Sequence, residues 1–141
     1  MNFVTVTAKD EQIDNVSTIP MEIISLNNRQ RFIAKQGLEY INVKLSDIAY
    51  FFSQGKLIFL IDKEKRKFVT GYYSLSAVKE IIKSDSFYQV NRKYLINVDY
   101  ILYFKPYKNS QILMELKVPT KQKVIISQER AVSFRRWING L

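Results

Sequence analysis

From residue 31 onward, short segments rich in β-branched and aromatic residues follow one another with only a few residues between them. Five of them precede the middle of the chain, at 31–35, 40–44, 48–52, 56–62 and 67–70. The residues between them are typical of tight turns: Gln36-Gly37, Ser53-Gln54-Gly55 and the charged run 63–66. Parallel strands need long crossover connections, so such spacing predicts a mainly β fold of small antiparallel sheets.

Two helices are expected beside these strands. Ser74 is a natural N-cap, and an apolar stripe at helical spacing follows it, formed by Leu75, Val78, Ile81 and Ile82. Further strand signals lie at 87–90, 100–105, 111–117 and 123–126, with turns at 106–110 and 119–122. Ser127 can then cap a C-terminal helix that runs to about residue 138, and Gly140 stands where a C-cap glycine would. We expect one short mid-chain helix and one C-terminal helix.

The charge of the chain is unevenly distributed. The 141 residues carry a net charge of +9, yet residues 1–28 hold one lysine and four acidic residues, a net of −3. The rest of the chain therefore carries +12, which favours a polyanionic partner. With 141 residues and 47% hydrophobic content, one compact domain is expected. We place it at 31–141, preceded by an acidic N-terminal extension at 1–30.

The composition argues against catalysis. Without histidine or cysteine, the usual nucleophile–base triads and zinc sites lose their ordinary members. Ser76 and Lys79 have the Ser-x-x-Lys spacing of penicillin-recognising hydrolases, but the companion motifs of those enzymes are absent. The glycines are scattered singly, so no phosphate-cradling loop is present. We expect no enzyme activity, cofactor or metal. With no signal peptide or membrane-length apolar stretch, a cytoplasmic location without membrane insertion is expected.

The segment 87–101 is the most informative about function. An apolar frame is interrupted there by the triplet Asn91-Arg92-Lys93. The three side chains bring many N–H donors to a place where a strand should turn. In a basic chain, donors held on a rigid edge suggest contact with phosphates or base edges. A planar guanidinium such as that of Arg92 can bridge guanine O6 and N7, whereas Lys93 suits phosphate. The alternative for the triplet 91–93 is a solvated turn that binds no ligand. Asn97 lies in an apolar run and is expected to bind backbone groups.

The same segment resembles the signature of the LytTR family of bacterial DNA-binding domains. That pattern runs roughly Phe-x-Arg-x-His-Arg-Ser-Tyr-Leu-Val-Asn, with Ile a few residues later. The matching residues are Phe87, Arg92, Tyr94, Leu95, Asn97 and Ile101. Asn91 replaces the histidine of the pattern, and Lys93 replaces the serine. The resemblance extends in pattern over 31–141 and implies an elongated LytTR-like arrangement of antiparallel sheets.

The resemblance also implies which residues meet DNA. Members of the family reach DNA through loops, and two further loops correspond here to 53–56 and to the start of the C-terminal helix. Ser127-Gln128 stands where the family often has Ser-Arg, and Arg130 could substitute for that arginine. For two of these residues a role without DNA contact stays open: Lys56 could be a solvent-exposed charge of a hairpin, and Ser127 could act only as an N-cap. The predicted DNA-binding residues are Asn91, Arg92, Lys93, Gln54, Lys56, Ser127, Gln128 and Arg130.

We therefore expect sequence-specific binding of double-stranded DNA by a response regulator-like protein that regulates transcription. The resemblance implies paired direct repeats in the DNA, and hence two copies of the chain. No phosphorylatable receiver domain fits within residues 1–30, so phosphorylation control would require a partner regulatory protein. Two other functions stay open. One is a β module for single-stranded nucleic acid, with aromatic residues as stacking platforms. The other is a protein-interaction or sensor module that does not bind DNA.

Overall fold

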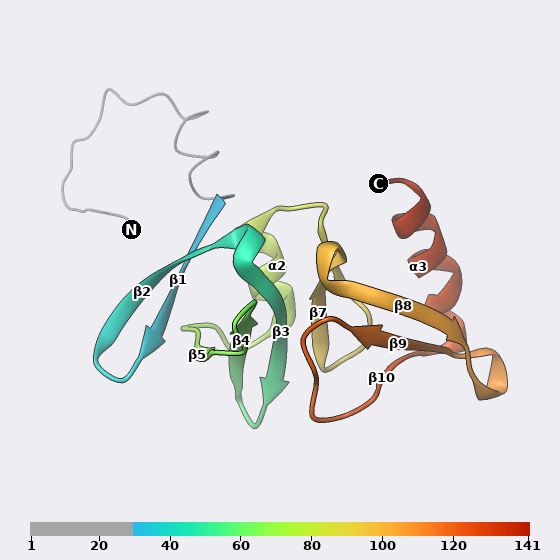
Figure 1. The fold of residues 1–141 in the computed structure, drawn as a ribbon, viewed down its shortest axis with the longest axis horizontal. Coiled ribbons are helices and arrows are strands. Elements are labelled where there is room, and N and C mark those ends of the chain that lie inside the picture. The colour runs from blue at the N-terminus through green and yellow to red at the C-terminus, as the bar shows by residue number, and fades with distance from the viewer. Residues whose placement is uncertain (1–29) are drawn as a thin grey trace.

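The structure, a computed structural model, describes residues 30–141 (Figure 1). The expected extension 1–30 lies outside the described residues except for Gln30. The strands in this range are β1 (Arg31–Gln36), β2 (Glu39–Lys44), β3 (Ile48–Gln54), β4 (Leu57–Asp62), β5 (Lys67–Val69), β6 (Phe87–Gln89), β7 (Tyr94–Asn97), β8 (Ile101–Pro106), β9 (Ile112–Leu116) and β10 (Val124–Ile126). The α-helices are α2 (Leu75–Ile82) and α3 (Gln128–Asn139). Three single 3₁₀ turns are η1 (Leu45–Asp47), η2 (Val98–Tyr100) and η3 (Lys108–Ser110).

All the strand pairs within 30–141 are antiparallel, as the short turns predicted. Seven strands form one sheet in the order β2-β1-β5-β4-β3-β7-β6, and the other three form a second sheet in the order β10-β9-β8. Gly37 and Gly55 turn the first two hairpins with φ of +62° and +63°, a backbone conformation that favours glycine. The mainly β, elongated fold expected from the sequence is confirmed, and the two sheets lie side by side (Figure 1).

Strand β3 is buried on both faces and joins two hydrophobic cores. Ile48 and Phe51 pack with α2 and the first five strands, in a core that also holds Phe32, Leu60 and Val78. The strand register shifts between Ile48 and Tyr50, and the two neighbours Ala49 and Tyr50 both belong to a second core with the three-stranded sheet and α3. A strand covered on both faces needs apolar residues at every position, which explains the unbroken run 48–52.

Helix α2 forms where the sequence predicted it. The Ser74 hydroxyl accepts a hydrogen bond from Ala77 N at 3.1 Å, and Leu75, Val78 and Ile82 are buried. Ile81 was expected on the same face, but 47% of it is exposed. Successive helical residues are rotated by about 100°, so Ile81 falls at the margin of the stripe that Val78 and Ile82 define.

Helix α3 also has its predicted ends. The Ser127 hydroxyl accepts a hydrogen bond from Arg130 N at 3.3 Å. Gly140 caps the other end and donates its N–H to Arg136 O and Trp137 O. Its φ of −87° is right-handed, so this cap does not use the left-handed conformation open to glycine. Neither α-helix of residues 30–141 is long and apolar enough to span a membrane.

Strand β7 was missed by the sequence analysis. Tyr94, Leu95, Ile96 and Asn97 are all buried, so these residues lack the polar–apolar alternation that marks a half-exposed strand. β7 pairs with both β3 and β6, and it is the last strand but one of the large sheet. The triplet 91–93 is therefore the loop of a β6–β7 hairpin.

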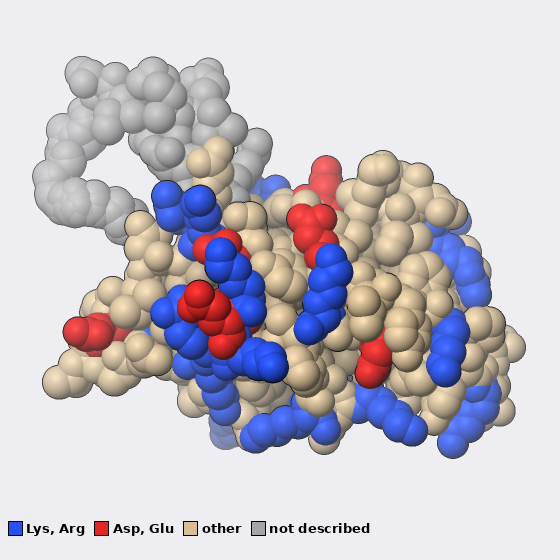
Figure 2. Space-filling model, in the orientation of Figure 1, with Lys and Arg blue, Asp and Glu red and all other residues tan. Residues whose placement is uncertain are grey.

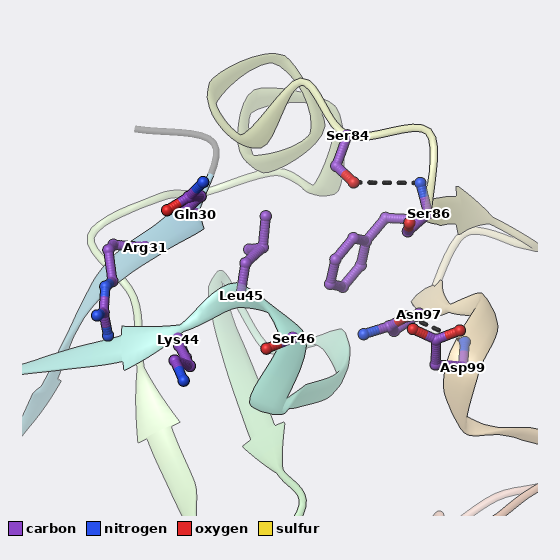
Figure 3. A pocket seen from close by; sticks show the side chains of 10 residues that line it. Gln30, Arg31, Lys44, Leu45, Ser46, Ser84, Ser86, Asn97 and Asp99 are labelled. Atoms are coloured by element: carbon purple, nitrogen blue, oxygen red, sulfur yellow. Dashed lines mark hydrogen bonds between the residues drawn. The ribbon is translucent and has the colours of Figure 1, made fainter. Parts of the chain in front are cut away.

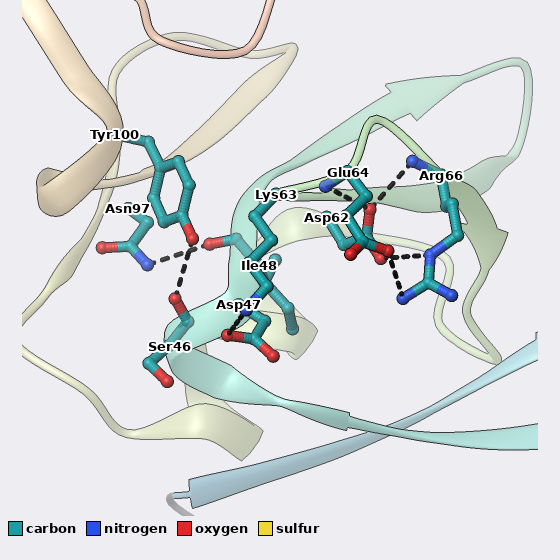
Figure 4. Close-up of polar contacts among 9 residues, drawn as sticks. All are labelled: Ser46, Asp47, Ile48, Asp62, Lys63, Glu64, Arg66, Asn97 and Tyr100. Carbon is teal, nitrogen blue, oxygen red and sulfur yellow. Dashed lines mark hydrogen bonds and ion pairs between the residues drawn. The ribbon is translucent and has the colours of Figure 1, made fainter.

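Polar side chains fix the segment that leads from β7 into β8 (Figure 4). Asn97 donates from Nδ2 to Ile48 O at 2.9 Å, and its Oδ1 accepts from Asp99 N at 3.0 Å. The Tyr100 hydroxyl donates to Ser46 O at 3.0 Å. The expectation that Asn97 binds backbone groups is confirmed.

The charged run after β4 is organised by a single buried carboxylate, that of Asp62 (Figure 4). Its Oδ1 accepts from Glu64 N and Arg66 N, and its Oδ2 accepts from Arg66 Nε at 2.7 Å. Lys63 pairs with Asp47 at 3.3 Å. Two cations of the run, Lys63 and Arg66, are thus paired with carboxylates of the protein at its surface.

Candidate nucleic-acid interface

The β6–β7 loop is held in place by the side chain of Asn91. Its Oδ1 accepts hydrogen bonds from Lys93 N at 2.8 Å and Tyr94 N at 3.0 Å, and its Nδ2 donates to Ile125 O at 2.9 Å. The first two bonds close the turn, and the third ties the turn to strand β10 of the other sheet. The Asn91 amide is thus engaged by the protein at both ends.

The next two residues of the loop have no such ties. Arg92 is exposed and Lys93 is half-buried. Within residues 30–141, neither side chain forms an ion pair or a hydrogen bond with another residue. An exposed guanidinium and an adjacent ammonium on a fixed turn are free to bind an external anion or a base edge. Asn91 positions the loop that presents them.

The β3–β4 hairpin lies next to this loop, because Ser53 N donates to Lys93 O at 3.0 Å. Its predicted contact residues Gln54 and Lys56 are both exposed. Gln54 Oε1 accepts a hydrogen bond from Lys67 Nζ at 3.2 Å, so part of its hydrogen-bonding capacity is used inside the protein. Lys67 Nζ also lies 4.3 Å from the centroid of the Phe59 ring.

The start of α3 supplies the third predicted region. Arg130 donates from Nη1 to Gln89 O at 3.0 Å and so fastens α3 to strand β6. Gln128 is exposed at the first turn of the helix. The N-terminus of a helix attracts anions through its free N–H groups, and Ser127 leaves that end partly open to solvent.

A groove of about 490 Å³ brings two of these regions together. Eleven residues line it: Asn91, Arg92, Lys93, Tyr94, Gln111, Gln122, Lys123, Ile125, Ser127, Glu129 and Arg130. Five of them were predicted site residues, from the β6–β7 loop and the start of α3. Gln54, Lys56 and Gln128 do not line it. Four cations face one carboxylate, Glu129, so the groove is basic. We call it the first groove.

The sequence analysis missed the contribution of the β9–β10 loop, whose residues Gln122 and Lys123 line the first groove. It interpreted 119–122 only as a turn. A signal was available, because residues 117–128 contain three lysines and no acidic residue. In Figure 1 the β3–β4 hairpin, the β6–β7 loop and the β9–β10 loop all point to the lower edge of the molecule. Figure 2 shows Lys and Arg side chains gathered along that edge.

Another hollow, of about 340 Å³, lies away from this edge, beside strands β1 and β2 (Figure 3). Its charges are mixed, with Arg31 and Lys44 on one side and Asp99 on the other. Two of its other polar side chains accept hydrogen bonds from nearby backbone, Asn97 from Asp99 N and Ser84 from Ser86 N. Nothing in this hollow favours one kind of ligand. Residues 30–141 also hold no group of three or more acidic side chains able to bind a metal ion.

Comparisons with known proteins point to the same family that the segment 87–101 resembles. The family model of the LytTr DNA-binding domain matches residues 39–139. Among solved structures, the chain is similar to a LytTr DNA-binding domain from Bacillus cereus, with a TM-score of 0.66 and 24% sequence identity. That similarity covers 77% of this chain and 96% of the other, and it concerns the fold. No curated protein matches this chain significantly.

Proposed function

Because this chain belongs to the LytTR family of DNA-binding domains, we propose that it binds double-stranded DNA at specific sequences and regulates transcription in the cytoplasm. The observation that carries the proposal is the first groove. There Arg92, Lys93 and Lys123 gather beside the N-terminus of α3, and the side chains of Arg92 and Lys93 have no ion-pair partner in the described part of the chain, residues 30–141. DNA supplies both the phosphates and the base edges that such groups bind.

Arg92 is the residue best placed to read a base. It is exposed at the tip of a hairpin whose backbone is fixed by Asn91, so its guanidinium can enter a groove of the duplex. A bidentate contact to guanine is worth about 1–3 kcal/mol of discrimination. Gln128 is exposed on the neighbouring helix and is proposed as a second base contact.

The remaining predicted residues would position the DNA backbone. Lys93 and Lys56 would each bind a phosphate, and the Ser127 end of α3 would bind another through its N–H groups. Gln54 on the β3–β4 hairpin could join them. Arg130 acts indirectly, because its guanidinium holds α3 against Gln89.

The assembly on DNA is also proposed. Two copies on paired direct repeats would double the number of loops that reach the DNA, and a partner regulatory protein would supply the input signal. Both ideas derive from the family resemblance.

The test compares Arg92→Ala with Lys93→Ala. A preferred duplex is first selected from random sequences with the wild-type chain, and each variant is then titrated with that duplex and a scrambled one. Arg92→Ala should reduce the preference for the selected duplex by about 5- to 150-fold, the equivalent of 1–3 kcal/mol. Lys93→Ala should weaken binding to both duplexes by the same factor.

Lys44→Ala is the matched control, since Lys44 is an exposed lysine outside the proposed interface. Circular dichroism checks that all three variants fold. Equal losses on both duplexes for Arg92→Ala would reassign Arg92 to a phosphate contact. Stronger binding to single-stranded than to duplex DNA would reject the duplex as the ligand.

A further inference from the structure

The loop that joins β9 to β10, residues 117–123, is unusual for its charge. It holds Lys117, Lys121 and Lys123, and the nearest acidic residues in sequence are Glu115 and Glu129. Lys121 and Lys123 are exposed. Neither forms an ion pair within residues 30–141. Lys123 Nζ lies 5.7 Å from the centroid of the Tyr107 ring, but no carboxylate of residues 30–141 neutralises either ammonium group.

A second groove, of about 310 Å³, lies on the other side of this loop. Its floor contains Tyr50 and Phe52 from strand β3, and its basic residues are Lys65, Lys67 and Lys121. No carboxylate lines it. Lys121 thus faces the second groove, whereas Lys123 faces the first groove, and the loop forms the ridge between two basic grooves.

Two tyrosines hold the ridge against the large sheet. The Tyr50 hydroxyl donates to Pro119 O at 2.9 Å, and the Tyr94 hydroxyl interacts with the Gln122 backbone and the Thr120 side chain. Within the loop, Thr120 Oγ1 donates to Gln122 O at 2.6 Å. Burial raises the pKa of Tyr50 to about 12, with a smaller contribution from Tyr94, so Tyr50 remains a hydrogen-bond donor even at a pH where an ordinary tyrosine ionises.

A loop fixed in this way loses little conformational freedom when it binds. Lysine ammonium groups displayed on a fixed ridge, without an ion pair among residues 30–141, match the regularly spaced phosphates of a nucleic-acid strand. They do not offer the planar geometry that bidentate base reading requires.

We propose that a DNA strand crosses this ridge, with Lys123 bound to a phosphate in the first groove and Lys121 bound to another in the second groove. The inference rests on the proposed duplex binding and adds to it a sequence-independent contact that extends the interface beyond the β6–β7 loop and α3. The ridge fixes the register of the protein on the DNA, and Arg92 reads sequence within that register.

The test is the salt dependence of binding by Lys121→Ala, Lys123→Ala and the double variant. Each lost phosphate contact should make the slope of log affinity against log salt concentration shallower by about 0.9, so the double variant should lose about 1.8. The affinity loss should be equal on preferred and scrambled duplexes. Lys121→Arg with Lys123→Arg should restore the wild-type slope, and Lys44→Ala should leave it unchanged.

The outcomes separate this inference from the proposed function. If the wild-type chain binds duplex DNA but the double Ala variant keeps its slope, the ridge does not touch phosphates and the inference is wrong. A loss confined to the preferred duplex would also overturn it, because the ridge would then read bases. If the wild-type chain binds no duplex, the proposed function itself fails, and the inference falls with it.

Discussion

Replacing Asn91 by Ala should destabilise the protein, because the fold uses both ends of this amide. The substitution removes three hydrogen bonds, to Lys93 N, Tyr94 N and Ile125 O, at 2.8, 3.0 and 2.9 Å. A typical protein hydrogen bond contributes about 0.5–1.5 kcal/mol net. Asn91 is half-buried, so water can replace part of what is lost. We expect a decrease of about 2 kcal/mol in the free energy of unfolding.

Asn91→Asp divides this effect into two parts. The carboxylate can still accept from Lys93 N and Tyr94 N, but it cannot donate to Ile125 O. The free energy of unfolding should therefore decrease less in Asn91→Asp, by about 1 kcal/mol, the value of one hydrogen bond. The order of stability should be wild type, then Asp, then Ala.

Urea unfolding followed by circular dichroism measures these differences. Asn42→Ala is the matched control, because Asn42 is an exposed asparagine of strand β2 without a side-chain hydrogen bond among residues 30–141. It should change the free energy of unfolding by less than about 0.5 kcal/mol. If Asn91→Ala is as mild as Asn42→Ala, then the amide does not hold the loop. A loss of DNA affinity without a loss of stability would point instead to a direct DNA contact.

Three further predictions concern stability and domain limits. Asn97→Ala should lower the free energy of unfolding by about 2–4 kcal/mol, because it removes the side-chain donor to the Ile48 carbonyl and the N-cap of η2. Urea unfolding measures this decrease. The pKa of Tyr50 is raised to about 12, so the unfolded chain releases this proton first as the pH rises. The part of the free energy of unfolding that depends on this proton, up to roughly 2–3 kcal/mol, should be intact below pH 10 and lost towards pH 12. Urea unfolding at pH 9 and 11.5 measures this loss, which should be smaller for Tyr50→Phe than for the wild type. A chain that begins at Asn28 should keep its melting temperature and its duplex affinity, because the acidic segment removed has the same charge sign as DNA; a fall in either would place that segment within the domain.

Local signals explain why most elements could be predicted from the sequence. The β1–β2, β3–β4 and β4–β5 hairpins depend on turns of two to four residues, and α2 depends on a cap and a stripe within nine residues, so each is readable in a short window. Strand β7 was missed because it is buried on both faces and has no alternation to detect. β7 pairs with β6 in a local hairpin, but its place inside the large sheet depends on pairing with β3, about 44 residues earlier in the chain.

The candidate site was predictable only where it is local. The triplet 91–93 was correctly placed at a turn, but the sequence could not separate the structural role of Asn91 from the exposure of Arg92. That separation depends on Ile125 O, which lies 34 residues away. The sequence predicted only a turn at 119–122 in the 117–123 loop, because the position of this loop beside β3 depends on the contact of Tyr50 with Pro119, 69 residues apart. Contacts of that range are set by the docking of the two sheets.

Duplex binding as a function of salt concentration tests the central proposal most directly. Residues 29–141 carry +12, and the interface proposed here places several cations against phosphates. Log affinity should fall linearly with log salt concentration, with a slope of about −4 or steeper, since each phosphate contact contributes about −0.9. A flat salt response, or no duplex binding near about 100 mM salt, where phosphate contacts still operate, would contradict the proposal that this chain acts on DNA.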